Sequence, residues 1–296
     1  MSSGGRLSHA ERTALEPRES DIHRVILKRI DQVNHNIRLL RLGIPMRRSI
    51  TASTSPNTFL FLPGQWLDVF IPGFEKPGGF TITSTPVDAT SSSKSDGHLE
   101  LAIQRSPNPP AAWLSQPRDV ILDKELFVRV GGSFVWPPPY SDLNTIKRVV
   151  FVAGGVGINP LISMLGHLDK QHATNNFTIN FIYTTRAPST NVGEVLFITR
   201  LRQIFSQIRS PTSFLHLHLT GDHKISLPPP GPDYEIPIIR QRPTEKDLYE
   251  ALGPEEERSG VVAYVCGPPA MTDSFVEILQ AAKGMDRKRV LCEKWW

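Results

Sequence analysis

The chain lacks the features that would assign it to a disulfide scaffold or a membrane. It contains only two cysteines, Cys266 and Cys292, and neither lies in a zinc-binding motif. Its longest apolar stretch, residues 147–165, is interrupted by three glycines, an asparagine and a proline. Such a stretch is a poor membrane span. We therefore expect a soluble globular protein with no membrane span.

The chain also has little excess of charge. Lys and Arg outnumber Asp and Glu by only 33 to 29, and the tight basic clusters at 47–48 and 287–289 are not interleaved with aromatic residues. Residues 1–20 contain three arginines but also three glutamates, and no apolar signal core. The sequence thus predicts no nucleic-acid partner, and no clear presequence is expected in this chain.

The residue pattern changes near residue 140. Before it, short apolar or alternating runs are broken by Pro, Gly and Ser, which is typical of a sandwich or barrel. Beyond the proline-rich stretch 136–145, strands alternate with helices, which predicts a parallel sheet covered on both faces. The predicted domain organisation is a tail at 1–20, a β domain at 21–140, a linker at 141–147 and an α/β domain at 148–296.

The expected elements follow from these patterns. Strands are predicted at 25–30, 37–42, 58–62, 66–71, 79–83, 99–104 and 126–130 in the first region, and at 149–153, 178–184, 214–220 and 260–266 in the second. Helices are predicted at 161–172, 192–208, 245–252 and 271–283.

The stretch KRVVFVAGGVGINPLISML, residues 147–165, joins a buried strand to a helix through a glycine turn. Asn159 is a suitable N-cap and Pro160 suits the first helical position. A bare backbone turn before a helix lets an anion approach unpaired N–H groups at the positive end of the helix dipole. The spacing lacks the third glycine of the dinucleotide fingerprint, so the turn by itself fits either a phosphate site or a tight connection.

Two histidines, His216 and His218, alternate along a predicted strand and so share one face. This arrangement raises a metal-binding hypothesis, but no further ligand cluster is evident. A polar strand face is the preferred interpretation, and no metal site is predicted.

Six motifs follow one another in the order and spacing of the ferredoxin–NADP reductase superfamily. They are LPGQWLDVFIP at 62–72, GGFTITSTP at 78–86, VRVGGSF at 128–134, AGGVGINP at 153–160, FIYTTR at 181–186 and CGPPAMTDSF at 266–275. The resemblance runs from about residue 21 to the C-terminus. Within the superfamily, GGFTITSTP, NPPAAWL at 108–114 and the terminal EKWW are most similar to the oxidoreductase NAD-binding domain-containing protein 1 group. The resemblance implies an antiparallel flavin-binding β-barrel followed by a doubly wound parallel-sheet domain that binds NAD(P).

By this resemblance, GGFTITSTP is the flavin-binding strand. Phe80 matches the aromatic residue that packs on the isoalloxazine, Thr81 matches the hydroxyl residue that hydrogen-bonds near the reactive nitrogen, and Ile82 and Thr83 continue the motif. On its own, Phe80 would also suit a barrel core. The chain departs from the family pattern at Gly78, where the superfamily has an arginine that neutralises the FAD pyrophosphate.

The second pyrophosphate element departs as well. NPPAAWL has Asn108 and two prolines where the family has Gly with Ser or Thr at a helix start. Lys76 or Arg105 are the nearby candidates to replace the missing charge.

The nucleotide motifs match the family more closely. Gly154, Gly155, Val156, Gly157 and Pro160 correspond to the pyrophosphate turn.

The other nucleotide residues are implied in the same way. Thr185 and Arg186, which follow Thr184, stand where the adenosine ribose is read, and Arg186 does not decide between NADH and NADPH. The nicotinamide end corresponds to Cys266, Gly267, Pro268 and Met271. Cys266 is expected beside the hydride-carrying carbon, although as a residue it is also a typical buried small hydrophobe.

The C-terminal EKWW carries two tryptophans that must pack on something. By resemblance, Trp295 or Trp296 shields the flavin and Glu293 is a proton partner. Anchoring of one tryptophan in a core groove is the alternative.

The main hypothesis is a flavin oxidoreductase that passes hydride from NADH or NADPH to bound FAD, with Thr81, Cys266 and Glu293 as catalytic residues, and electrons onward to an unknown acceptor. The acceptor is a separate protein, a quinone, a free flavin or oxygen, because no iron–sulfur or haem motif is present.

The alternative is an NAD(P)H-binding regulatory protein with weakened or lost flavin binding. A metal-binding or structural protein is the third hypothesis. The resemblance suggests mitochondria as the location, with the cytoplasm as the alternative.

Overall fold

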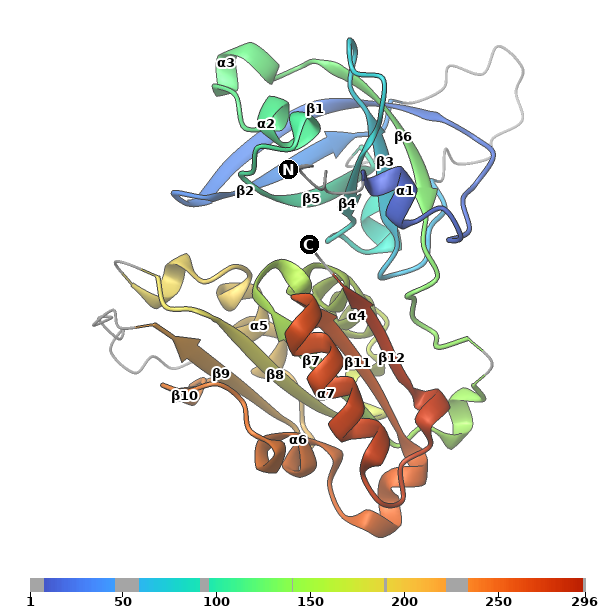
Figure 1. The fold of residues 1–296 in the computed structure, drawn as a ribbon, viewed down its shortest axis with the longest axis vertical. Coiled ribbons are helices and arrows are strands. Elements are labelled where there is room, and N and C mark those ends of the chain that lie inside the picture. Colours follow the sequence, from blue (N-terminus) through green and yellow to red (C-terminus); the bar gives the residue numbers. More distant parts are fainter. Residues whose placement is uncertain are drawn as a thin grey trace, which may run out of the picture. The chain divides into compact units, whose positions relative to one another are not determined.

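The chain forms two compact units, Met1–Val135 and Trp136–Trp296, in the computed structural model (Figure 1). The structure describes residues 8–45, 59–90, 96–139, 141–188, 191–221 and 234–294. The division falls a few residues before the predicted linker at 141–147, so Trp136 and the prolines after it belong to the second unit.

The first unit is built on a six-stranded antiparallel sheet with the strand order β4-β3-β6-β1-β2-β5. Its strands are β1 (His23–Asn34), β2 (Ile37–Gly43), β3 (Trp66–Phe70), β4 (Gly78–Thr81), β5 (His98–Gln104) and β6 (Glu125–Gly131). Its helices are α1 (His9–Arg12), α2 (Pro109–Leu114) and α3 (Arg118–Ile121), with a 3-10 turn at Pro86–Ala89. An isolated bridge between Ile82 and Leu101 joins the chain after β4 to β5. The sheet is therefore barrel-like but not closed.

Alternation along the strands creates the core of this unit. Val25 and Leu27 of β1, and Leu67 and Val69 of β3, point inward and are fully buried. The predicted strand at 58–62 is wrong for the residues that the structure describes, because 59–62 are not in a strand. Residue 58 itself lies outside the described residues. The aromatic rings at 59 and 61 are nevertheless buried in the core.

The second unit contains a six-stranded, entirely parallel sheet with the order β10-β9-β8-β7-β11-β12. Its strands are β7 (Arg148–Gly154), β8 (Thr178–Arg186), β9 (Phe214–Thr220), β10 (Ile238–Ile239), β11 (Val261–Gly267) and β12 (Val290–Lys294). Its helices are α4 (Ile158–Lys170), α5 (Ile198–Phe205), α6 (Glu245–Leu252) and α7 (Pro269–Ala281). The strands run outward from β7 in one direction to β10 and in the other to β12, which is the doubly wound arrangement predicted.

Helices lie on both faces of this sheet (Figure 1). Leu248 of α6 and Leu279 of α7 pack with Val150 and Val152 of β7 in one hydrophobic cluster. Val149 and the other alternate residues of β7 face the opposite side. None of the helices in the described part of the chain has the length and hydropathy needed to cross a membrane.

Three features of the second unit differ from the prediction. The predicted helix at 192–208 is shorter, because Phe197 adopts a left-handed conformation and α5 begins only after it. The edge strands β10 and β12 were not predicted, since β10 has only two residues and β12 is short with a mixed rather than fully apolar pattern.

Candidate functional site

The carboxyl ends of β7 and β11 lie side by side in the second unit. Ala153 of β7 pairs with Cys266 of β11, and the chain leaves these strands toward opposite edges of the sheet. This is the switch point of a doubly wound sheet, where ligands bind in the crevice outside the carboxyl ends of the strands. The two motifs predicted to bind the dinucleotide thus meet at one place.

Three glycines allow the two turns to approach each other closely. A Cβ atom on Gly157 would lie 2.3 Å from the carbonyl oxygen of Cys266, and one on Gly267 would lie 3.0 Å from the Cα of Gly154. A Cβ on Gly154 would lie 2.6 Å from the sulfur of Met271. Side chains at these positions would force the turns apart.

Gly155 has a different role. Its φ is +55°, in the left-handed region that favours glycine, and no other side chain or backbone atom of the described part of the chain lies within 4 Å of a Cβ placed on it. The backbone at this point is open to a ligand. The predicted Asn159 cap is wrong, because the 3-10 turn Gly155–Gly157 runs directly into α4, which begins at Ile158.

The helix start offers further donors. Gly157 is the N-cap of α4 and supplies no side-chain hydrogen bond to the first turn. The Ile158 N–H already donates to Gly155 O and Val156 O in the 3-10 turn, so the donors open to an anionic ligand lie at the start of that turn, around Gly155. Pro160 is buried in the first turn of α4, and Val156 is half-buried.

The predicted ribose residues come from the neighbouring strand. Thr184 of β8 pairs with Gly154 of β7, so Thr185 and Arg186 continue past the glycine turn on the same edge of the sheet. Thr185 is half-buried and the side chain of Arg186 is exposed. The structure thus brings Arg186 to this edge with an accessible guanidinium group.

Cys266 is fully buried between strands β7 and β12. Its partner in register on β12 is Glu293, which is half-buried. This pairing brings together two predicted catalytic residues.

Lys294, the next residue, forms an ion pair of 2.6 Å with Asp273 of α7. Trp295 and Trp296, predicted to cover the flavin, lie outside the described residues.

Thr81 carries the clearest signal in the first unit. Its side chain is 1% exposed, and its Oγ1 has no hydrogen-bond partner among the described residues. A buried hydroxyl without a partner costs free energy, so such a group is a candidate for binding a ligand. Beyond it, Ile82 N–H donates to Gln65 O at 3.0 Å, and the Thr83 hydroxyl donates to Glu100 Oε1 at 2.9 Å.

Gly78 and Phe80 lie on one face of β4, as residues two apart in a strand do. A Cβ on Gly78 would lie 2.6 Å from the Phe80 ring and 2.6 Å from Pro110 of α2. The half-buried Phe80 ring also packs on the core of the unit. The space over Gly78 is thus occupied by these two side chains.

The start of α2 is poor in donors. Pro109 and Pro110 occupy the first two helical positions and have no N–H, and Asn108 makes no side-chain cap. Lys76 lies 3.5 Å from Glu11, and Arg105 is exposed. The residues of β4 therefore fit the ring end of a flavin, whereas the elements expected to hold a pyrophosphate provide little charge and few N–H groups.

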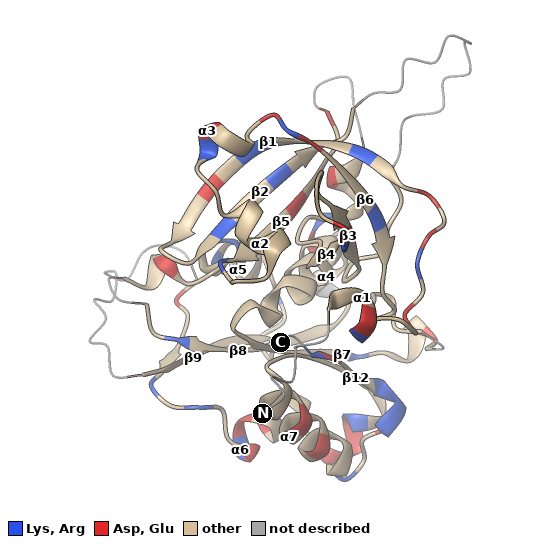
Figure 2. Cartoon of the chain, turned by 45° about the horizontal axis from the view of Figure 1, so that its top comes forward, with Lys and Arg blue, Asp and Glu red and all other residues tan. Residues whose placement is uncertain are grey.

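Charge alone does not identify a site. Lys and Arg are interspersed with Asp and Glu in both units (Figure 2). Several are paired, as Lys283 is with Glu255 at 2.8 Å. The candidate sites are recognised instead by the glycine turns and the buried hydroxyl.

Both histidines of β9 contact other residues of the second unit. His218 is fully buried with Nδ1 3.1 Å from Gln241 O, and the His216 ring stacks on Phe214 at 4.3 Å. Burial lowers the pKa of His218. Among the described residues, no three His, Cys, Asp or Glu side chains are grouped so as to hold a metal ion.

One group of residues near β4 was not predicted. His9, Arg18 and Arg129 surround the buried carboxylate of Asp68 on β3. The sequence gives no local signal for this cluster, because its members are up to 120 residues apart along the chain.

Solved structures share this fold. The cytochrome P450 reductase of Amycolatopsis is 17% identical with a TM-score of 0.64, covering 99% of this chain and 73% of that one. A ferredoxin–NADP⁺ reductase from Neisseria gonorrhoeae with bound FAD and NADP is 14% identical with a TM-score of 0.63, covering 94% of this chain and 100% of that one. No family model matches the chain.

A curated relative matches the whole chain. The oxidoreductase NAD-binding domain-containing protein 1 of Xenopus laevis is 33% identical over 304 residues, which cover 100% of this chain and 86% of the relative. With this identity over its full length, and with the fold and the order of motifs described above, the chain belongs to the oxidoreductase NAD-binding domain-containing protein 1 family.

Proposed function

We propose that the chain is an NAD(P)H-dependent flavin oxidoreductase. The second unit binds NADH or NADPH and the first binds FAD. Hydride passes from the nicotinamide to the flavin, and electrons pass onward to a separate acceptor. The observation that carries this proposal is the meeting of two glycine-rich turns at the carboxyl ends of β7 and β11, beside the open backbone at Gly155. The family name and the FAD and NADP of the Neisseria structure support it.

In the second unit, the backbone holds the pyrophosphate. The open turn at Gly155 and the N-terminus of α4 present N–H groups to it. Thr185 and Arg186 contact the adenosine ribose, with Arg186 available to a 2′-phosphate. Pro268 and Met271 lie at the nicotinamide end of the site, where the buried Gly267 lets its turn pack closely against Gly154.

In the first unit, Thr81 and Phe80 receive the isoalloxazine ring. The Thr81 hydroxyl gains the hydrogen-bond partner that it lacks, and the Phe80 ring excludes water from one side. When bound, the flavin accepts two electrons as hydride and releases them in pairs or singly. Glu293, paired in register with Cys266, is the proposed proton partner, and the buried thiol of Cys266 limits the space around the nicotinamide.

The second candidate function is an NAD(P)H-binding regulator that binds flavin weakly or not at all. The crowded backbone at Gly78 and the two prolines that open α2 favour it, because they remove charge and donors from the expected pyrophosphate site. This candidate keeps the dinucleotide site and omits the electron transfer.

The two functions are separated by titrating the purified chain with FAD and NAD(P)H in turn. An oxidoreductase retains flavin absorption after gel filtration or saturates with added FAD, and it then oxidises NAD(P)H with ferricyanide as the artificial acceptor. NAD(P)H binding without any FAD binding would support the regulator. Absence of NAD(P)H binding would contradict both.

A further inference from the structure

A short N-terminal segment, residues 8–19, lies against one face of the first sheet. Two backbone hydrogen bonds attach it to β6 and the residue after it: Glu19 N–H donates to Val130 O, and Gly132 N–H donates to Pro17 O, both at 3.0 Å. Arg18 also forms a bridge with Gly131. The predicted tail at 1–20 is, over its described part, attached to the sheet.

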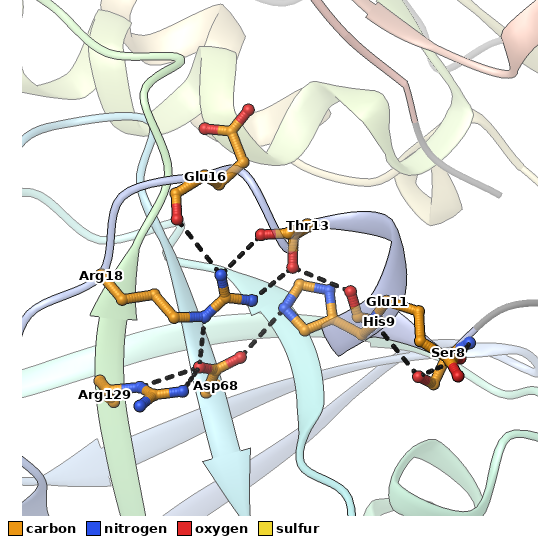
Figure 3. Close-up of polar contacts among 8 residues, drawn as sticks. All are labelled: Ser8, His9, Glu11, Thr13, Glu16, Arg18, Asp68 and Arg129. Carbon is orange, nitrogen blue, oxygen red and sulfur yellow. Dashed lines mark hydrogen bonds and ion pairs between the residues drawn. The ribbon is translucent and has the colours of Figure 1, made fainter.

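His9 is the residue through which this segment contacts β4. It is 5% exposed, its ring meets the Trp66 ring edge-on at 4.6 Å, and its Nε2 lies 3.2 Å from Asp68 Oδ1 (Figure 3). A Cβ on Gly79 would lie only 2.0 Å from His9 Nδ1. The imidazole therefore occupies the space that any side chain at position 79 would need.

Two arginines also contact Asp68. Arg18 Nε donates to Asp68 Oδ2 at 3.0 Å, and Arg129 Nη2 donates to the same oxygen at 2.7 Å (Figure 3). The Arg18 guanidinium also lies over the Trp66 ring, 4.8 Å from its centroid, and Nη1 donates to Thr13 O at 2.6 Å. Asp68 is fully buried, so these cations hold it, and the segment, in one geometry.

The register of the sheet connects this cluster to the flavin strand. Asp68 pairs with Gly79, and Trp66 pairs with Thr81, so all four residues share one face. Phe80 lies between Gly79 and Thr81 and points to the other face. A contact at Gly79 thus fixes the backbone that carries both residues proposed to receive the flavin.

We propose that His9 is a positioning residue for the flavin site. Because His9 packs on Gly79 and lies beside Asp68, it holds β4 in one position. Phe80 and Thr81 are therefore preorganised for the isoalloxazine ring. This inference rests on the proposed function, because it concerns the flavin that the first unit would bind.

The test measures FAD binding to the full chain by flavin fluorescence and compares His9→Ala with Gly79→Ala. Both changes remove the same contact, one from each side, so each is expected to weaken FAD binding about tenfold, which corresponds to about 1.4 kcal/mol of lost preorganisation. The double variant is expected to bind FAD no more weakly than either single variant, since the contact is lost only once. His9→Gln, which retains a donor, is expected to restore part of the affinity.

Two further measurements separate positioning from stability. His35→Ala, an exposed histidine in the β1–β2 turn, is the matched control and should leave FAD binding unchanged. At saturating FAD, His9→Ala should shift the midpoint potential of the bound flavin, because Thr81 is displaced. NAD(P)H affinity, which depends on the second unit, should not change.

The outcomes distinguish this inference from the proposed function. If the unaltered chain binds FAD and His9→Ala binds it equally well with an unchanged potential, the positioning role is overturned even if the melting temperature falls. Additive losses in the double variant would also overturn it. If the unaltered chain does not bind FAD, the proposed function fails, and the inference fails with it.

Discussion

In the second unit, the residues at the proposed dinucleotide site are mainly glycines, whereas in the first unit the proposed flavin strand is supported by buried charged side chains. Gly154, Gly157 and Gly267 are buried and bring two turns together, and the neighbouring Gly155 leaves the backbone open. The buried carboxylate of Asp68 forms ion pairs with Arg18 and Arg129. The comparison indicates that the second unit keeps its polar groups available to an anionic ligand, and that the first unit uses its strongest charges to hold its own strands.

The largest effect is expected when the buried carboxylate of the first unit is neutralised. Asp68→Asn leaves Arg18 and Arg129 without their counter-charge, so the free energy of unfolding should fall by ~3–5 kcal/mol. Urea unfolding of the full chain measures this. Asp123→Asn, which removes an exposed pair with Lys28, should cost less than ~1 kcal/mol. Equal effects would contradict the difference drawn between buried and exposed charges.

The next largest effect is expected when a side chain is added at the glycine contact of the second unit. Gly157→Ala places a methyl group against the backbone of Cys266, which should lower the free energy of unfolding by ~1–3 kcal/mol and disrupt NAD(P)H binding. Unfolding and NAD(P)H fluorescence titrations measure the two effects. Gly43→Ala is the control, because its methyl group would closely approach only the flexible side chain of Lys28 and would make an ordinary contact with Ile26 O at 3.8 Å. Retention of NAD(P)H affinity in Gly157→Ala would argue against the site.

The pH dependence of the free energy of unfolding tests the buried carboxylate of the first unit without a mutation. Burial alone would raise the pKa of Asp68, but hydrogen bonds from His9, Arg129 and Arg18 outweigh it and lower the pKa to about 2 from an ordinary value of 3.8. The contribution of a group with a depressed pKa is present above its unfolded value and is lost as the pH falls through its folded value.

About 2 kcal/mol of stability should therefore disappear between about pH 4 and pH 2 through this carboxylate. Urea unfolding at a series of pH values follows the loss. The same acid-induced loss should be absent from Asp68→Asn; its persistence there would assign it to other groups.

A matched pair at Gly155 tests the open turn of the second unit. Asn and Asp both tolerate its left-handed conformation and have the same shape, so they differ only in charge. Gly155→Asp should bind NAD(P)H about tenfold more weakly than Gly155→Asn, because a carboxylate opposes the pyrophosphate. Equal affinities of the two variants would mean that the phosphates lie elsewhere.

The smallest effect is expected at Arg186. If its exposed guanidinium meets a 2′-phosphate, Arg186→Ala should weaken NADPH binding several-fold, about 1 kcal/mol, with less effect on NADH. The comparison of the two dissociation constants measures this. An equal loss for both nucleotides would remove the residue from the choice between them.

Much of the second unit was predictable because its signals are local. The apolar strand and glycine turn at 147–165 correctly predicted a strand-turn-helix, and α6 has the predicted bounds. The pairing of Glu293 with Cys266 was not predictable, because β12 is a short edge strand with little pattern and its register depends on contacts with β11. The start of α4 was misplaced because Asn159 and Pro160 satisfy the rules for a helix start, while the 3-10 turn before them already begins the helix.

The support of the flavin strand depends on residues that are far apart in sequence. GGFTITSTP could be recognised as a motif. The packing of His9 on Gly79 and of the Phe80 ring on Gly78 could not be predicted, because neither contact has a local sequence pattern. Burial of Asp68 is equally hidden, since an isolated aspartate in a strand gives no indication of its partners.

The most direct test of the account is the anaerobic mixing of the FAD-loaded chain with NADH or NADPH, followed through the visible absorption band of oxidised flavin. The account predicts that the band disappears in a single turnover with at least one nucleotide and returns when an electron acceptor is added. FAD that is bound but remains oxidised in the presence of bound NADH and bound NADPH would contradict it.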